Sequence, residues 1–146
     1  MPLGIPGSMK EEHEELHEEL RKATNMPGKV GQAAKNVTKV LHPHFEKENE
    51  LAFPEIGIAR EIAEGKTSPD FAAARKLCIE FKQEYVKMLQ EHQEIVKALD
   101  ELETVAKAGR RRNVVEFSRK LKLHAMTEEA LTYPAVLMIG ILLGDS

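Results

Sequence analysis

A long run of apolar residues at alternating three- and four-residue spacings is the feature that most restricts the fold of this chain. Between residues 69 and 108 the spacing is kept from the first member to the last. Such a seam is typical of an α-helix that buries one face in a bundle. The members of this seam are Phe71, Ala74, Cys78, Phe81, Tyr85, Met88, His92, Ile95, Leu99, Leu102 and Ala106.

Three further segments carry seams of the same kind. Turn-forming residues at 24–28, 64–70 and 108–113 divide the chain into segments 9–23, 28–64, 69–108 and 113–143. None of the segments alternates with period two, so no strand is predicted. The sequence therefore predicts a single all-α domain, an up-down-up-down four-helix bundle. Pro43, Pro54 and Pro134 fall inside predicted helices, and Pro54 is the expected position of a break.

The chain ends and the composition restrict the function further. Residues 1–8, "MPLGIPGS", resemble an added leader, so we expect the native domain to be 9–146. No basic block with interleaved aromatic residues is present, which argues against nucleic acid. The longest apolar run, 135–144, is about half the length of a membrane span, and no signal peptide is visible. We therefore expect a cytoplasmic protein that binds neither membrane nor nucleic acid.

Polar residues interrupt all four seams at matched positions. The stretch "HFEKENELAFPEI" (44–56) and the stretch "HAMTEEALTYPAV" (124–136) both place Glu four residues after His, followed by Leu, an aromatic residue and Pro. "EHEEL" around His13 likewise matches "EHQEI" around His92, so the chain resembles two copies of one helical hairpin. The seam positions affected are His13, His44, Glu48, His92, His124 and Glu128.

Two buried carboxylates beside four imidazoles indicate a metal site. A buried carboxylate costs several kcal/mol unless it is paired or binds a cation. His and Glu four residues apart share one helix face, so each His-x-x-x-Glu pair can reach one cluster. We expect a di-metal site in the core, with His13 and His44 on one ion, His92 and His124 on the other, and both glutamates as bridges. This donor set suits iron, manganese or zinc.

These same residues carry a resemblance to a known family. His13, "PHFEKENELAFP", His92 and "HAMTEEALTYP" resemble the hemerythrin-like, or HHE cation-binding, domain, from Met9 to about Gly140. The resemblance implies a four-helix bundle with a non-haem centre of two iron ions, for which another divalent metal can substitute. It also implies that the partner is dioxygen, a related diatomic or peroxide, and that the module binds or senses it rather than acting as an enzyme.

The sequence departs from the oxygen-carrying hemerythrins at two positions. Val96 replaces the second His of their third helix, and the acid of the fourth helix is Glu128, or Glu129 at the five-residue spacing, rather than Asp. These departures predict a more symmetric site and argue against simple reversible oxygen carriage. The alternatives are a di-iron oxidase or peroxidase that turns over, and a metal-sequestering regulatory bundle without ligand chemistry.

Two other histidines need a separate interpretation. "HEELH" (13–17) matches a zinc-protease pattern, but it lies in a Glu-rich run where that pattern arises easily. His17, one turn from His13, is either a rim residue or a fifth histidine ligand. His42 is two residues from His44 and is expected to face solvent. The ferritin-like Glu-x-x-His motif occurs only once, so that family is disfavoured.

A difference in helix length predicts an assembly. The segment before His92 is about five turns longer than the segment before His13. The overhang should leave a groove that either residues 1–8 or a second subunit covers, and we expect a homodimer. The apolar residues expected to line this groove are Ile58, Ile62, Phe71, Ala74, Met138 and Leu142.

Overall fold

The computed structural model describes residues 3–144, and all regular secondary structure within that range is helical. The prediction of an all-α protein is thereby confirmed. The elements are α1 (Gly7–Thr24), α2 (Gly28–Leu51), α3 (Phe53–Ile56), α4 (Ala59–Ala63), α5 (Phe71–Ala108), α6 (Arg112–Thr127), the π-helical turn η1 (Glu128–Thr132) and α7 (Tyr133–Leu142).

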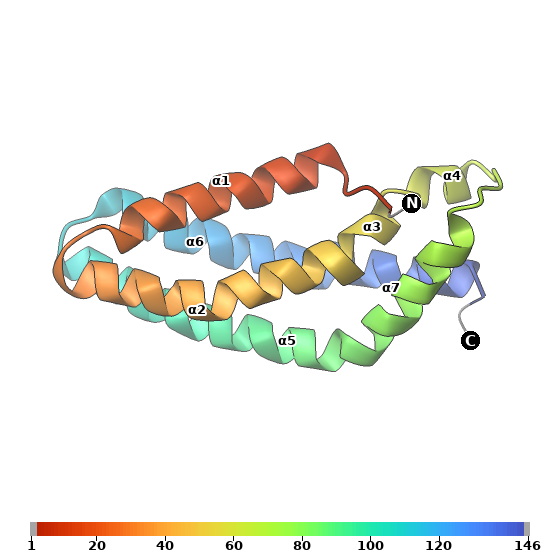
Figure 1. The fold of residues 1–146 in the computed structure, drawn as a ribbon. Coiled ribbons are helices and arrows are strands. Elements are labelled where there is room, and N and C mark those ends of the chain that lie inside the picture. The colour runs from red at the N-terminus through yellow and green to blue at the C-terminus, as the bar shows by residue number, and fades with distance from the viewer. Residues whose placement is uncertain (1–2, 145–146) are drawn as a thin grey trace.

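Four long helical stretches lie side by side along the molecule (Figure 1). α2 packs against α1 and α5, and α6 packs against α5 and α1. The α1–α2 and α5–α6 turns lie at one end, whereas α3, α4 and α7 lie at the other end together with both chain ends (Figure 1). Gly28 begins α2 with φ +73, a left-handed conformation that side chains disfavour.

The buried apolar residues form two clusters along the long axis. One cluster lies toward the two turns and includes Leu20, Val37 and Leu99; the other lies toward α7 and includes Phe81 and Val136. Full burial of each large apolar side chain contributes about 1.5–3 kcal/mol. Along each long helical stretch, the polar seam residues fall between the members of the two clusters. The two clusters therefore stabilise the bundle on either side of a polar layer.

Pro54 ends the second predicted helix early. α2 stops at Leu51, and α3 begins at Phe53 with Pro54 in its first turn. Inside a helix, proline lacks the N–H for a backbone hydrogen bond and crowds the carbonyl four residues earlier, whereas it suits a first turn. The predicted segment 28–64 is therefore three helices, and the break lies at the expected proline. Pro43 lies inside α2 without ending it.

Pro134 produces a different result in the matched position of the fourth segment. Its missing N–H would leave a gap in an α-helix, and its ring would crowd the preceding turn. Here the chain widens into η1, and the N–H of Tyr133 donates to the carbonyl of Glu128, five residues earlier. Such a π-helical turn adds one residue to a helical turn and keeps the helix continuous.

The π-helical turn changes which residues of the fourth seam are buried. We expected Leu131, Ala135, Met138 and Leu142 to face the interior, but Leu131, Met138 and Leu142 are 67%, 57% and 70% exposed. That expectation was wrong beyond Glu128. The extra residue in the turn rotates the rest of the helix, so the buried residues are instead Tyr133, Val136, Ile139 and Gly140.

The groove expected beside the short first helix is largely filled. Ile58 and Ala74 are buried, and Ile62 is half-buried. Ile5, in the segment that we expected to be foreign to the fold, packs with Met9 against the cluster near α7. Of the two expected covers, residues before α1 thus fill part of the groove, together with α3 and α4, and the homodimer stays a prediction.

The stretch Arg112–Leu142 is long and apolar enough to cross a membrane by length and composition alone. A buried helix in a soluble core can pass the same test, and 33% of the most apolar window is buried here. The stretch also carries His124 and Glu128, whose side chains join the polar cluster described below.

Glu55 is a buried carboxylate at the end of the molecule near α7. It lies in α3 and has no exposed surface. Neither of its carboxylate oxygens has a hydrogen-bond partner among the described residues. Burial, with a smaller contribution from the charge of Glu80, raises the pKa of Glu55 to about 9. The side chain is therefore neutral at physiological pH.

Candidate metal centre

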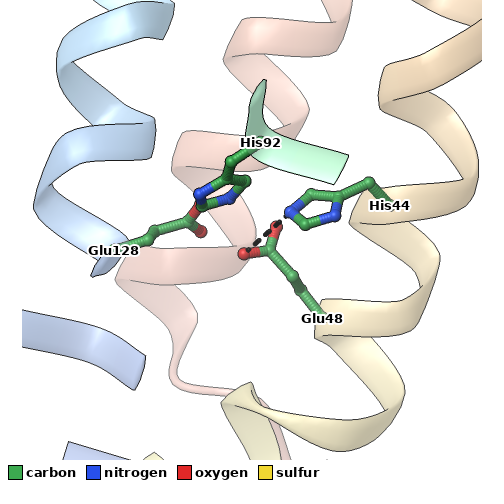
Figure 2. A group of neighbouring side chains, drawn as sticks. All are labelled: His44, Glu48, His92 and Glu128. Atoms are coloured by element: carbon green, nitrogen blue, oxygen red, sulfur yellow. Dashed lines mark ion pairs between the residues drawn. The ribbon is translucent and has the colours of Figure 1, made fainter. Parts of the chain in front are cut away.

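The six polar seam residues converge in the middle of the molecule. In each of two groups, the donor atoms lie within 4.8 Å of one another, a spacing that a metal ion could bridge. Figure 2 shows the first group, with α2 supplying His44 and Glu48 to the same space as His92 and Glu128. The groups are His44, Glu48, His92 and Glu128, and His13, His124 and Glu128.

The grouping of the histidines differs from the expected one. His44 lies with His92, their ring centroids 4.6 Å apart. His13 lies with His124, and their Nε2 atoms are 3.3 Å apart. We had expected His13 with His44 and His92 with His124. That pairing was wrong. Each group combines helices from different copies of the hairpin: α1 with α6, and α2 with α5.

The Nε2 atoms of all four histidines point toward the two central carboxylates. The carboxylate of Glu128 lies 3.2 Å from Nε2 of His92 and 3.2 Å from Nε2 of His124. Nε2 of His13 is 3.7 Å from Glu128 and 3.8 Å from the Oε1 atom of Glu48. Glu128 therefore touches both groups, as a bridging carboxylate would.

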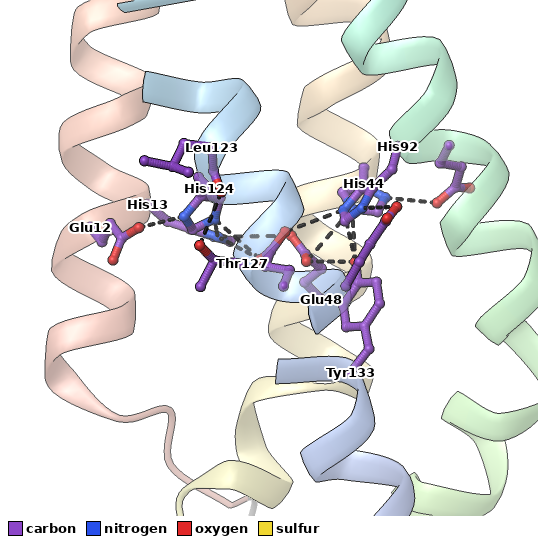
Figure 3. A network of polar contacts seen from close by, with 12 residues as sticks. Glu12, His13, His44, Glu48, His92, Leu123, His124, Thr127 and Tyr133 are labelled. Atoms are coloured by element: carbon purple, nitrogen blue, oxygen red, sulfur yellow. Dashed lines mark hydrogen bonds and ion pairs between the residues drawn. The ribbon is translucent and has the colours of Figure 1, made fainter. Parts of the chain in front are cut away.

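Three of the histidines are held from behind by an outer carboxylate, which the sequence did not indicate. Glu91 accepts from Nδ1 of His44 at 2.9 Å, and Glu129 accepts from Nδ1 of His92 at 3.0 Å. His124 Nδ1 is hydrogen-bonded in the same way to Glu12 on α1 (Figure 3). An N–H donated at Nδ1 leaves the lone pair at Nε2, which faces the centre.

The centre contains more hydrogen-bond acceptors than donors. His13 Nδ1, Glu48 Oε1 and Glu128 Oε2 are buried and lack hydrogen-bond partners among the described residues. Unsatisfied buried oxygens are costly, whereas cations bind such oxygens and neutral imidazole nitrogens together. The residues present therefore fit one or more metal ions, with carboxylate and imidazole donors.

Without a cation, the two central carboxylates do not ionise together. Burial raises the pKa of Glu48 well above its ordinary value, and the nearby charge of Glu128 raises it further. Burial opposes ionisation of Glu128 as well, but its contacts with His124, His13 and His92 hold its pKa well below the ordinary value. The metal-free centre therefore holds a proton more tightly at Glu48 than at Glu128.

Tyr133 is the member of the centre that sequence reasoning missed. Its hydroxyl donates to Glu48 Oε2 at 2.7 Å and lies 3.1 Å from Nε2 of both His44 and His92 (Figure 3). The π-helical turn places it there, since the predicted seam ran through Leu131 instead. The only sequence signal for Tyr133 was its match to Phe53: each aromatic residue lies nine positions after the histidine of its His-x-x-x-Glu motif.

The centre is less symmetric than the repeat predicts. Phe53 occupies the position in the first copy that Tyr133 occupies in the second, and its ring lies 4.7 Å from that of His13. A phenyl ring has no donor atom, whereas the phenol does. His13 also lacks an outer carboxylate, because the position matching Glu129 is Asn49. The six donors are matched between the two copies, but their surroundings are not.

His17 and His42 lie outside both groups. The ring of His17 is 5.3 Å from that of Phe45, which in turn stacks on His13 at 3.8 Å. Burial, with the nearby His42 and His13, lowers the pKa of His17 below its ordinary value. His42 is exposed, as expected. His17 thus contacts a neighbour of the centre but not the central carboxylates.

No family model matches the chain, and neither a curated protein nor a solved structure matches it.

Proposed function

We propose that this protein is a hemerythrin-like four-helix bundle that binds two iron ions and responds to dioxygen or a related small oxidant or diatomic. The long helices α1, α2, α5 and α6, with short α1–α2 and α5–α6 turns, support the bundle, and the matched His-x-x-x-Glu motifs support the family. A cytoplasmic location, without a membrane or nucleic-acid partner, remains a prediction from the sequence.

The observation that carries the proposal is the orientation of the imidazoles. Glu91, Glu129 and Glu12 each accept the Nδ1–H of a different histidine, so the corresponding Nε2 lone pairs all face the central carboxylates. Metal-binding histidines almost always donate their second ring nitrogen in this way. A neutral imidazole that donates Nδ1–H outward keeps its Nε2 lone pair for a cation that would lie beside the central carboxylates.

The donor groups divide naturally between two ions. His44, His92 and Glu48 would hold one ion, with the hydroxyl of Tyr133 close enough to join them. His13 and His124 would hold the other, and Glu128 would contact both. This division leaves fewer donors on the side of His13, where Phe53 supplies only an apolar ring.

Two ferrous ions, when bound, would supply electrons and open coordination positions to a small oxidant. The protein contributes a closed environment, since His44 and Glu48 are almost fully buried and apolar clusters lie on both sides. Tyr133 contributes a hydroxyl proton beside Glu48. His124 is the most exposed donor, with 13% of its side chain accessible, so it marks the side nearest to solvent.

Metal content and the visible spectrum test the proposal. Metal-free protein is loaded with ferrous iron under nitrogen, desalted and analysed, and we expect two iron ions per chain. Air exposure should then produce new absorption from the oxidised centre, and Glu128→Gln should reduce both signals. Binding of one ion or none, or full iron content in Glu128→Gln, would contradict the proposed centre.

A di-iron oxidase or peroxidase is the second candidate, and Tyr133 is the observation that favours it. A phenol 2.7 Å from a central carboxylate can deliver a proton or an electron to a bound oxidant. Steady consumption of peroxide with a reducing substrate would assign an enzyme, and Tyr133→Phe should slow it. An unchanged spectrum on air exposure would favour the third reading, a bundle that only sequesters metal.

A further inference from the structure

The two histidines outside the buried centre form a pair of their own. The chain has six histidines, and four belong to the buried donor groups. The remaining two, His17 on α1 and His42 on α2, face each other across the two helices. Their ring centroids are 5.4 Å apart, and the rings meet edge to face at 71°.

This separation suits two imidazoles on one ion. With Zn–N distances of about 2.0–2.1 Å, two histidines on a tetrahedral zinc place their ring centroids roughly 5 Å apart. Both side chains line a surface hollow between α1 and α2 with a volume of about 540 Å³. A cation and its remaining water ligands therefore have room there.

Carboxylates beside the pair favour a cation over an anion. Glu46 contacts Nε2 of His42 at 3.0 Å, one helical turn along α2. Glu14 lines the hollow from α1, one turn before His17. The single arginine of the hollow, Arg21, is already paired with Glu18 at 2.7 Å. Imidazole with carboxylate and water is a donor set typical of divalent first-row metals.

We propose that His17 and His42 form a separate surface site for one divalent transition-metal ion, outside the buried centre. One aromatic ring separates the two sites: Phe45 stacks on His13 at 3.8 Å and meets the ring of His17 at 5.3 Å. The site would thus hold a cation one aromatic ring away from His13, in the donor group of His13, His124 and Glu128. It requires no particular metal in the buried centre.

Zinc titration of the full chain tests the site. Equilibrium dialysis of the parent should give one more bound zinc ion per chain than dialysis of His42→Gln or His17→Gln. Each substitution removes one of the two imidazoles and should weaken this additional site by at least about tenfold. Glu18→Gln is the matched control, because it removes a carboxylate from the same hollow that is already engaged by Arg21.

Site-specific NMR gives a second readout. In the parent, the ring signals of His17 and His42 should shift together as the additional zinc ion binds. This is the ion that the His17→Gln and His42→Gln variants should not bind. Melting curves check that the variants fold. His42 is exposed, so we expect His42→Gln to fold like the parent. Equal zinc binding in the parent and both histidine variants, or zinc-dependent shifts confined to the four buried histidines, would overturn the proposal. The buried centre could fail its own iron test without changing this difference.

Discussion

Replacing Glu55 with glutamine should remove a pH dependence of stability that this one side chain causes. Glu55 is fully buried, and burial raises its pKa from an ordinary 4.5 to about 9. Between these values the folded chain holds a proton at Glu55 that the unfolded chain has released. The stability of the parent should therefore fall as the pH rises through this range.

The size of the effect follows from the width of the pKa shift. One bound proton changes the free energy of unfolding by about 1.4 kcal/mol per pH unit. Raising the pH from about 6 to about 8 should thus cost the parent up to about 2.7 kcal/mol at this position. Glutamine has the same shape and no titration, so Glu55→Gln should gain stability relative to the parent by about 1–3 kcal/mol over the same interval.

Denaturant unfolding of the metal-free protein, followed by circular dichroism at pH 6, 7 and 8, measures the difference. Glu50→Gln is the matched control, because Glu50 is exposed and lies only five residues earlier. The free energy of unfolding of Glu50→Gln should change with pH in the same way as that of the parent. Parallel curves for Glu55→Gln and the parent would refute the reasoning and show that the Glu55 carboxylate finds a donor or an ion.

The remaining predictions concern the centre and the assembly. Glu129→Gln should weaken metal binding by about 10–100-fold, because it removes the acceptor behind His92; chelator competition measures this, and unchanged affinity would mean that the ring is oriented otherwise. In metal-free protein, Glu48→Gln should leave thermal stability equal or higher, because burial raises the pKa of Glu48. Glu128→Gln should lower it by about 1–3 kcal/mol, because contacts with His124, His13 and His92 lower the pKa of Glu128. The opposite order in paired melts would place the charge on Glu48. Met138→Glu should turn the predicted homodimer into monomers in sedimentation runs, because Met138 is an exposed apolar residue; a monomeric parent at high concentration would reject the dimer.

The seams predict most of the buried core because the helical period is a local property. The expected members on α5 are buried at nine positions, with only Phe71 and Tyr85 partly exposed. The same reasoning placed all six polar seam residues near one another. It failed beyond Glu128, where Pro134 is accommodated by an extra residue in the turn. A period counted along the sequence cannot reveal such an insertion, so Leu131 was placed inside and Tyr133 was missed.

The seam spacing did not predict which helices contact each other. The outer carboxylates Glu12 and Glu91 each directly precede a seam histidine in sequence, yet each bonds a histidine on a neighbouring helix. Their role depends on how the helices are rotated and paired. The seams define which face is buried but not which neighbour meets it, and the wrong pairing of His13 with His44 had the same origin.

The carboxylates around the centre have a consequence for its overall charge balance. If bound metal ions displaced the proton of Glu48, five carboxylates would be ionised, and with the ammonium of Lys47, which contacts Glu91 at 2.7 Å, they would leave four negative charges on the donors and their immediate partners. Two divalent cations neutralise that set completely. Two trivalent cations exceed it, and the excess would draw in an anion or release the proton of Tyr133. In the proposed di-iron centre, oxidation would therefore be coupled to the uptake of an anion or the loss of a proton. The five carboxylates are Glu12, Glu48, Glu91, Glu128 and Glu129.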